Sequence, residues 1–144
     1  MITQQSQGLD SRHTRDIADA LARRLAAIAP LPPDHPDASL AAFTVPGAAE
    51  AIDKAIDADL QAPGVTDVTA AHRDSPRLIK QERADYLLPT VLHCSSPDAA
   101  IAGKEYMFPF VTVVECPEAR MLDAIERPLS SSSMSSRPSA SRSL

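Results

Sequence analysis

Apolar residues near the start of the chain recur every three or four positions, which is the spacing of one face of an α-helix. The positions that keep this spacing are Ile17, Leu21, Leu25 and Ile28. Asp10 and Ser11 precede them, and either side chain is suited to cap the first helical turn. We therefore expect a helix that runs from this cap to Ala29 and packs on a larger structure through its apolar face.

A second helix is predicted after a segment that is rich in proline. Each ring between Pro30 and Pro36 removes a backbone donor and fixes its own φ, so this segment should be a linker. Pro46 suits a first helical turn, and the apolar positions Ile52 and Ile56 follow at helical spacing. The helix should stop at Pro63-Gly64. We expect the two helices to form a pair with each other.

Short runs of β-branched and other apolar residues predict several strands in the second half of the chain. They are Val65–Val68, Leu78–Ile79, Tyr86–Leu92 and Phe110–Glu115. The last two do not alternate cleanly between apolar and polar residues, which is typical of strands covered on both faces in an α/β sheet. A further helix should begin at Pro117 and carry Met121, Leu122 and Ile125. The pattern predicts an α/β fold with two or three helices on a short mixed sheet.

The composition sets the limits of the folded region. Residues 1–12 form a polar lead that we expect to be flexible, and residues 13–126 should form one domain. In residues 127–144, nine of the 18 residues are Ser. Too few large apolar side chains are present there to offset the entropy of ordering, so we expect a disordered tail.

The charge balance excludes several classes of partner. The net charge of −5, with acidic and basic residues intermixed, gives no electrostatic footprint for nucleic acid. Charges such as Asp16, Arg23, Asp53 and Lys54 are expected on solvated helix faces. The sequence contains no apolar run long enough to cross a bilayer and does not begin like a secretory signal, so we expect no membrane partner and a cytoplasmic protein.

Two segments carry a recognisable pattern. Asp85 to Leu92 reads Asp-Tyr-Leu-Leu-Pro-Thr-Val-Leu, and Lys104 to Val111 reads Lys-Glu-Tyr-Met-Phe-Pro-Phe-Val. In order and spacing they resemble the aromatic-x-x-Pro-Thr-Val strand and the Glu-x-Phe-Gly-Pro segment of the aldehyde dehydrogenase superfamily. Together with Val113 to Pro117, which follow them, the two segments are most similar in sequence to the branch of the superfamily associated with phenylacetic acid degradation. The resemblance implies part of the catalytic domain, downstream of the nucleophile.

The same resemblance implies a cofactor and two residues that would bind it. In the family, the Glu of the second segment binds the nicotinamide ribose hydroxyls of NAD or NADP and the Phe lies against the ring, which here points to Glu105 and Phe108. An alignment on Phe108 without a gap places Tyr106 where the family has its Glu, and Pro109-Phe110 replaces Gly-Pro. Glu105 as a solvated carboxylate and Phe108 as a core residue remain open alternatives.

The family's reaction also needs a nucleophilic Cys, a Glu that activates water and a dinucleotide domain, and none of these is found in the sequence. We therefore expect the chain to be a truncated fragment of an NAD(P)-dependent aldehyde dehydrogenase that is inactive alone and binds no cofactor alone. No catalytic residue is assigned. The fragment would self-associate or pair with an upstream fragment of the enzyme. The alternative is a small non-enzymatic binding or assembly module that pairs through exposed strand edges.

The remaining reactive side chains favour structural roles. Adjacent strand residues point to opposite faces, so His93 should not activate the thiol of Cys94, and we expect Cys94 to be an inert thiol. Cys116 precedes a helix start but has no evident base. The other histidines, His13, His35 and His72, stand at unrelated spacings. The sequence therefore predicts no metal site.

Overall fold

A computed structural model describes residues 5–126 and 130–131 of the chain. The α-helices are α1 (Gln5–Ala26), α2 (Ala48–Asp59) and α3 (Met121–Glu126). The strands are β1 (Val65–Asp67), β2 (Leu78–Lys80), β3 (Asp85–Leu87), β4 (Thr90–Cys94), β5 (Lys104–Glu105), β6 (Phe110–Val114) and β7 (Ser130–Ser131). Three 3₁₀ turns are η1 (Thr69–His72), η2 (Ala100–Gly103) and η3 (Glu118–Arg120). The fold is a mixture of helices and small sheets, as the predicted α/β class requires.

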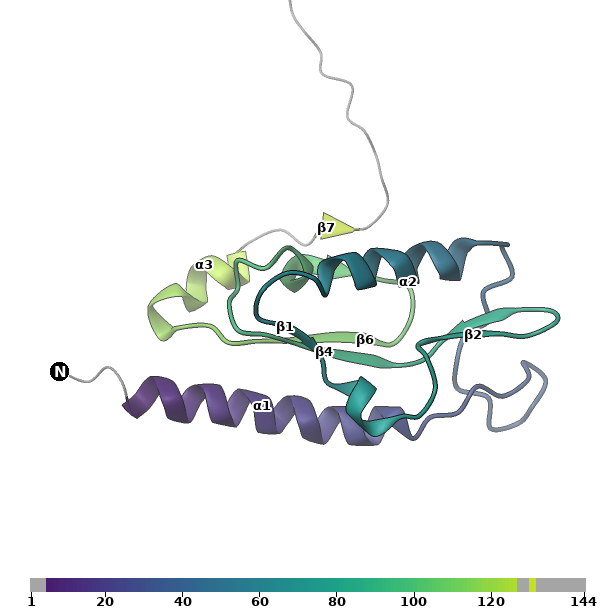
Figure 1. Cartoon of the computed structure of the whole chain (residues 1–144), viewed down its shortest axis with the longest axis horizontal. Helices are drawn as coiled ribbons and strands as arrows, with labels where there is room; N and C mark the ends of the chain where they lie inside the picture. The colour runs from purple at the N-terminus through teal and green to yellow at the C-terminus, as the bar shows by residue number, and fades with distance from the viewer. Residues whose placement is uncertain (1–4, 127–129, 132–144) are drawn as a thin grey trace, which may run out of the picture.

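The main sheet has three strands in the order β1-β4-β6 and is mixed, as predicted. β4 lies in the centre, antiparallel to β1 and parallel to β6. Figure 1 shows α1 on one face of this sheet and α2 on the other. The prediction that the two helices pair with each other is therefore wrong, because each packs its own apolar residues against the sheet that separates them.

The face of α1 that meets the sheet is lined by small residues. Ala18 and Ala22 are fully buried there and pack with Val91 of β4. Ile17 and Leu21, which the spacing assigned to the buried face, are 45 % and 37 % exposed. The helix therefore lies rotated from its predicted orientation, since Ala side chains allow a closer approach to the sheet than Ile and Leu do.

The largest cluster of buried residues lies between the sheet and α2. It joins Ile56 of α2 to Leu92 and Cys94 of β4, and it also includes Ile101 and Phe108. All five residues of β4 are buried, which agrees with the prediction of a strand covered on both faces. Because alternate side chains of β4 point to opposite faces, this strand connects the two layers of core.

The predicted strand from Tyr86 to Leu92 is divided in two. β3 ends at Leu87 and pairs with β2 in a hairpin, whereas β4 begins at Thr90 and joins the main sheet. Pro89 lies at the break, and its ring supplies no N–H for a ladder. The apolar run is therefore continuous in sequence, but its two halves belong to different sheets.

Both ends of the predicted domain need correction. α1 begins at Gln5, earlier than the predicted cap at Asp10 or Ser11, so much of the expected polar lead is helical. In the expected tail, β7 pairs in parallel with β5, which main-chain groups can do without apolar side chains. The other predictions for residues 1–4, 127–129 and 132–144 concern residues outside those that the structure describes.

Candidate functional site at the ends of β4

The two residues assigned to a cofactor lie close in sequence but in different surroundings. Glu105 is exposed on β5 and lines an open cavity of about 520 Å³ with Tyr106, Phe110 and Thr112. Phe108 is only 9 % exposed and belongs to the core cluster. Its ring centroid is 6.2 Å from that of Tyr106 and 5.6 Å from that of Phe110. In this arrangement Glu105 is accessible to a ligand, whereas Phe108 is occupied by aromatic packing.

The carboxyl ends of β4 and β6 bring together charged residues that are far apart in the sequence. His93 Nε2 lies 3.0 Å from Glu115 Oε1, with side chains that are 7 % and 17 % exposed. The imidazole N–H and the carboxylate are poorly aligned, so this contact is an ion pair without a hydrogen bond of good geometry when His93 is protonated. Parallel pairing of Cys94 with Val114 explains why the next residue, Glu115, reaches His93.

Two residues of α1 complete this cluster. Ser11 Oγ donates a hydrogen bond of 2.7 Å to Glu115 Oε2. Arg15 Nε lies 3.7 Å from Glu115 Oε1. Both oxygens of the carboxylate are therefore engaged, and the cluster attaches the first half of α1 to the end of the sheet. The sequence signal for it was the position of His93 and Glu115 at the ends of two neighbouring strands.

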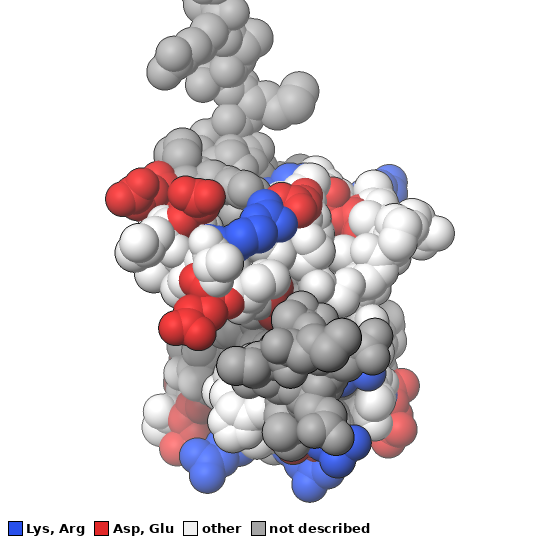
Figure 2. Space-filling view, turned by 90° about the vertical axis from the view of Figure 1, so that its left-hand side faces the viewer, with Lys and Arg blue, Asp and Glu red and all other residues white. Residues whose placement is uncertain are grey.

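An open cavity of about 580 Å³ adjoins this cluster. Its lining includes Ser11, His13, Glu115, Cys116 and Met121. In open α/β sheets, ligands bind where parallel strands end, which makes this cavity the candidate ligand site of the main sheet. Figure 2 looks at this end of the molecule, where acidic and basic side chains are intermixed at the surface.

The chemistry of the cluster does not match nucleophilic catalysis. In a Ser-His-acid triad the hydroxyl contacts the imidazole, which accepts its proton. Here the Ser11 hydroxyl contacts the Glu115 carboxylate, which separates it from His93. The arrangement can hold a cation or a hydrogen-bond donor, but it does not activate Ser11.

The two cysteines have different surroundings, and neither contacts a base among the described residues. Cys94 is fully buried, and desolvation raises the pKa of its thiol from 9.0 to about 11. It points to the α2 side, so the prediction that Cys94 and His93 face opposite sides of the sheet is confirmed. Cys116 lines the cavity, and its thiol donates to the carbonyl of Pro117 at 3.6 Å. Cys94 is therefore shielded from solvent, and Cys116 is the more accessible thiol.

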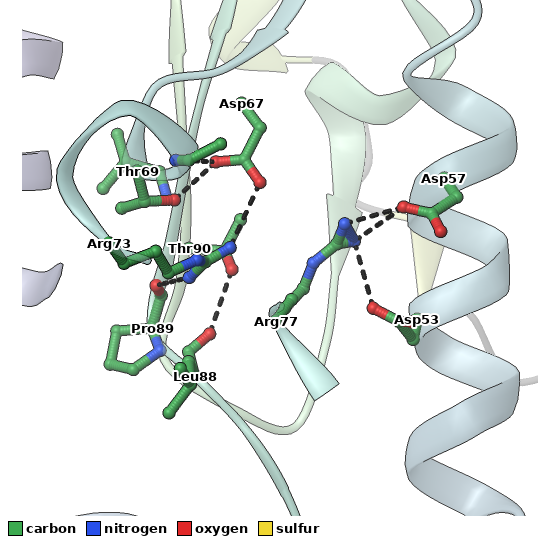
Figure 3. A network of polar contacts seen from close by, with 11 residues as sticks. Asp53, Asp57, Asp67, Thr69, Arg73, Arg77, Leu88, Pro89 and Thr90 are labelled. Carbon is green, nitrogen blue, oxygen red and sulfur yellow. Dashed lines mark hydrogen bonds and ion pairs between the residues drawn. The ribbon is translucent and has the colours of Figure 1, made fainter. Parts of the chain in front are cut away.

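At the start of β4, a buried arginine holds the chain in place. Arg73 donates a 2.9 Å hydrogen bond to the carbonyl of Pro89 and a 3.2 Å hydrogen bond to Asp67 Oδ2. The other oxygen of Asp67 accepts from the hydroxyl of Thr69 and from the N–H of Ala70. Figure 3 shows this network around the residues where β4 begins. Burial lowers the pKa of Arg73, and the charge of Asp67 opposes that shift.

A second buried arginine joins the hairpin to α2 (Figure 3). Arg77 Nη2 lies 2.8 Å from Asp57 Oδ1, and its Nη1 lies 3.5 Å from Asp53 Oδ1. Partial burial raises the pKa of Asp53 although Arg77 acts against that shift. The expectation that Asp53 lies on a solvated face is therefore wrong, because sequence spacing on the helix does not show which distant residue covers it.

Residues 5–126 and 130–131 carry neither of two further features. In this part of the chain, no group of three or more His, Cys, Asp or Glu residues is placed to hold a metal ion. No helix there combines the length and apolar character that crossing a membrane requires. Comparisons of the chain with protein-family models, with curated proteins and with solved structures give no match.

Proposed function

We propose that the chain supplies the part of an aldehyde-dehydrogenase-like catalytic domain that follows the nucleophile, and that it oxidises no aldehyde by itself. The complete enzyme would oxidise an aldehyde to an acid with NAD or NADP, in aromatic or phenylacetic acid catabolism. It would act in the cytoplasm, where both cysteines remain reduced.

The observation that supports this proposal is the meeting of the two motif segments. Pro89-Thr90-Val91 begins β4, and Phe108-Pro109 directly precedes β6. The N–H of Thr90 donates to the carbonyl of Pro109 at 3.0 Å, and Thr90 pairs with Phe110 in the parallel ladder. Segments that are separate in the sequence therefore form one structural unit, as parts of one site should.

The expected inactivity follows from the side chains that the reaction needs. A thiolate must attack the aldehyde, hydride must leave to a nicotinamide, and activated water must release the acid. The raised pKa of Cys94 disfavours its thiolate, and the contact of Cys116 is with a carbonyl. The four glycines Gly8, Gly47, Gly64 and Gly103 are too scattered to form a phosphate-binding loop.

The first test is an assay of the purified chain with NAD, NADP and a panel of aliphatic and aromatic aldehydes. We expect no formation of reduced nicotinamide, and measurable turnover would contradict the proposal. Co-expression with the nucleophile- and dinucleotide-bearing part of a phenylacetic-acid-type aldehyde dehydrogenase should restore hydride transfer. Failure of that pair to assemble or turn over would count against the family assignment.

The complemented enzyme also tests the cofactor residues. Glu105→Gln should raise the KM for the dinucleotide about tenfold, because a neutral amide accepts a weaker hydrogen bond from the ribose hydroxyls than a carboxylate does. Glu82→Gln is the matched control, since Glu82 is also exposed but lies between β2 and β3. Equal KM values for the two variants would show that Glu105 does not bind the dinucleotide.

A second candidate function is that of an assembly module, and it is favoured by the outer edge of the main sheet. β6 is an edge strand, and no described strand pairs with its outer side. Three apolar residues near this edge, on the α1 side of the sheet, each leave more than a third of their surface exposed. They are Ile17, Leu21 and Val111. An edge of this kind favours pairing with another strand.

A further inference from the structure

Three residues of β6 direct their main-chain groups toward the outer edge of the main sheet. Pro109 O accepts from Thr90, and Glu115 N donates to Cys94 O, so the odd-numbered residues of this strand direct their main-chain groups toward β4. Successive residues of a strand alternate in this respect. Phe110, Thr112 and Val114 therefore direct N–H and C=O outward, where no described residue pairs with them.

The sequence of β6 is nearly symmetric about its centre. It reads Phe-Val-Thr-Val-Val from Phe110 to Val114 and carries no charge. In an antiparallel pair of two copies centred on Thr112, Val111 would face Val113, and Phe110 would face Val114. The residues with outward main-chain groups would then face one another, which is the register that forms hydrogen-bonded pairs.

The side chains around this edge fit the same occupant. Oγ1 of Thr112 is buried and has no hydrogen-bond partner among the described residues. Two Thr side chains that meet across a strand pair can hydrogen-bond to each other. The cavity beside Glu105 also runs along this edge and is lined by Phe110, Val111 and Thr112. It offers room for side chains from the facing strand.

The exposed residues of α1 extend the apolar surface. Asp19 contacts His72 of η1, next to β1, at 2.7 Å. Each residue of an α-helix advances about 100° around the helix axis. Ile17 and Leu21 are each two positions from Asp19, so both lie roughly on the opposite side of α1. They therefore lie on the side of α1 that faces away from η1 and β1. A second copy that extends the sheet would bring the same apolar residues to meet them.

We propose that two copies of the chain pair through β6, antiparallel and centred on Thr112, to form one continuous sheet with two-fold symmetry. Natural edge strands that stay unpaired commonly carry Lys, Pro or a bulge, and β6 has none within its bounds. An isologous interface requires a self-complementary surface, which the symmetric strand provides. The inference rests on the second candidate function and is independent of the dehydrogenase resemblance.

Sedimentation equilibrium of the full chain, without aldehyde or nucleotide, tests the dimer. We expect a discrete dimer for the wild-type chain and a monomer for Val111→Lys, with the same far-ultraviolet circular dichroism spectrum. Val45→Lys is the matched control, because Val45 is exposed at 66 % and lies outside β6. A monomeric wild type, a dimer that survives Val111→Lys, or undefined aggregates in place of a dimer would overturn the proposal.

Cross-linking tests the register in a Cys116→Ser background. Thr112→Cys should give a disulfide-linked dimer under mild oxidation, because facing residues of a hydrogen-bonded pair have Cα atoms about 5.5 Å apart. Val113→Cys should not, because its facing residue is Val111 of the second copy. Equal cross-linking of the two variants would refute the centre at Thr112. Absence of dehydrogenase activity would leave both readouts unchanged.

Discussion

β4 begins and ends among buried charges, but its two ends satisfy those charges differently. At the start, Arg73 and Asp67 have side chains that are 6 % and 10 % exposed, and a hydrogen bond of 3.2 Å joins them. At the end, His93 and Glu115 contact each other without such alignment and lie beside an open cavity. The first cluster is therefore a closed structural support, whereas the second retains the capacity to bind another group.

Removing the arginine from the start of β4 should give the largest effect. Arg73→Met leaves the Asp67 carboxylate and the Pro89 carbonyl without their partner in a buried site. We expect the free energy of unfolding to fall by about 3–5 kcal/mol. Urea unfolding followed by circular dichroism measures this loss, with the exposed Arg24→Met as the control. A loss below about 1 kcal/mol would show that the network does not stabilise the fold.

A change at the other end of β4 should cost less. Glu115→Gln preserves an acceptor for the Ser11 hydroxyl but removes the charge that faces His93 and Arg15. We expect a loss of about 1–2 kcal/mol in the free energy of unfolding, because the site is partly open and the ion pair poorly aligned. The exposed Glu118→Gln, in the same cavity wall, should cause little change. If Glu115→Gln destabilises as strongly as Arg73→Met, the two ends do not differ as described.

The sequence predicted the elements better than their partners. The strands at Val65, Leu78 and Phe110 and the helix after Pro46 were located within a few residues. These predictions rest on local spacing and on turn residues, which act within a few positions. The rotation of α1 was missed because the period of Ile17 and Leu21 identifies an apolar face but not the closer packing of Ala18 and Ala22.

The candidate site depends on long-range contacts, which explains why most of it was not predicted. Ser11 and Glu115 are 104 positions apart and meet only because α1 lies across β4 and β6. Arg73 lies between His72 and Asp74, and nothing near it in the sequence indicates burial against Pro89. By contrast, the opposite orientations of Cys94 and His93 followed from strand alternation alone, since that property needs no distant partner.

The thiols offer a second contrast between a closed and an open position. At pH 8 we expect iodoacetamide to label Cys116 quickly and Cys94 only after unfolding, and Cys116→Ser should remove the fast reaction. The raised pKa of Cys94 means that the folded chain holds its proton more tightly than the unfolded chain. Its contribution to stability is therefore complete below pH 9.0 and is lost as the pH rises toward about 11. Fast labelling of Cys94 in the folded chain would contradict its burial.

The smallest effect is expected at the partly buried contact between α1 and η1. A hydrogen bond with His72, supported by Arg23, lowers the pKa of Asp19 below its usual value. The folded chain thus binds the proton of Asp19 less readily than the unfolded chain, so this contribution is present above the usual pKa and is lost as the pH falls through the lowered one. Asp19→Asn should remove that part of the acid dependence of unfolding, measured by thermal melts between pH 2 and pH 6, whereas the exposed Asp16→Asn should not. Identical acid profiles for the two variants would mean that α1 is held by its alanine face and by Glu115, without help from His72.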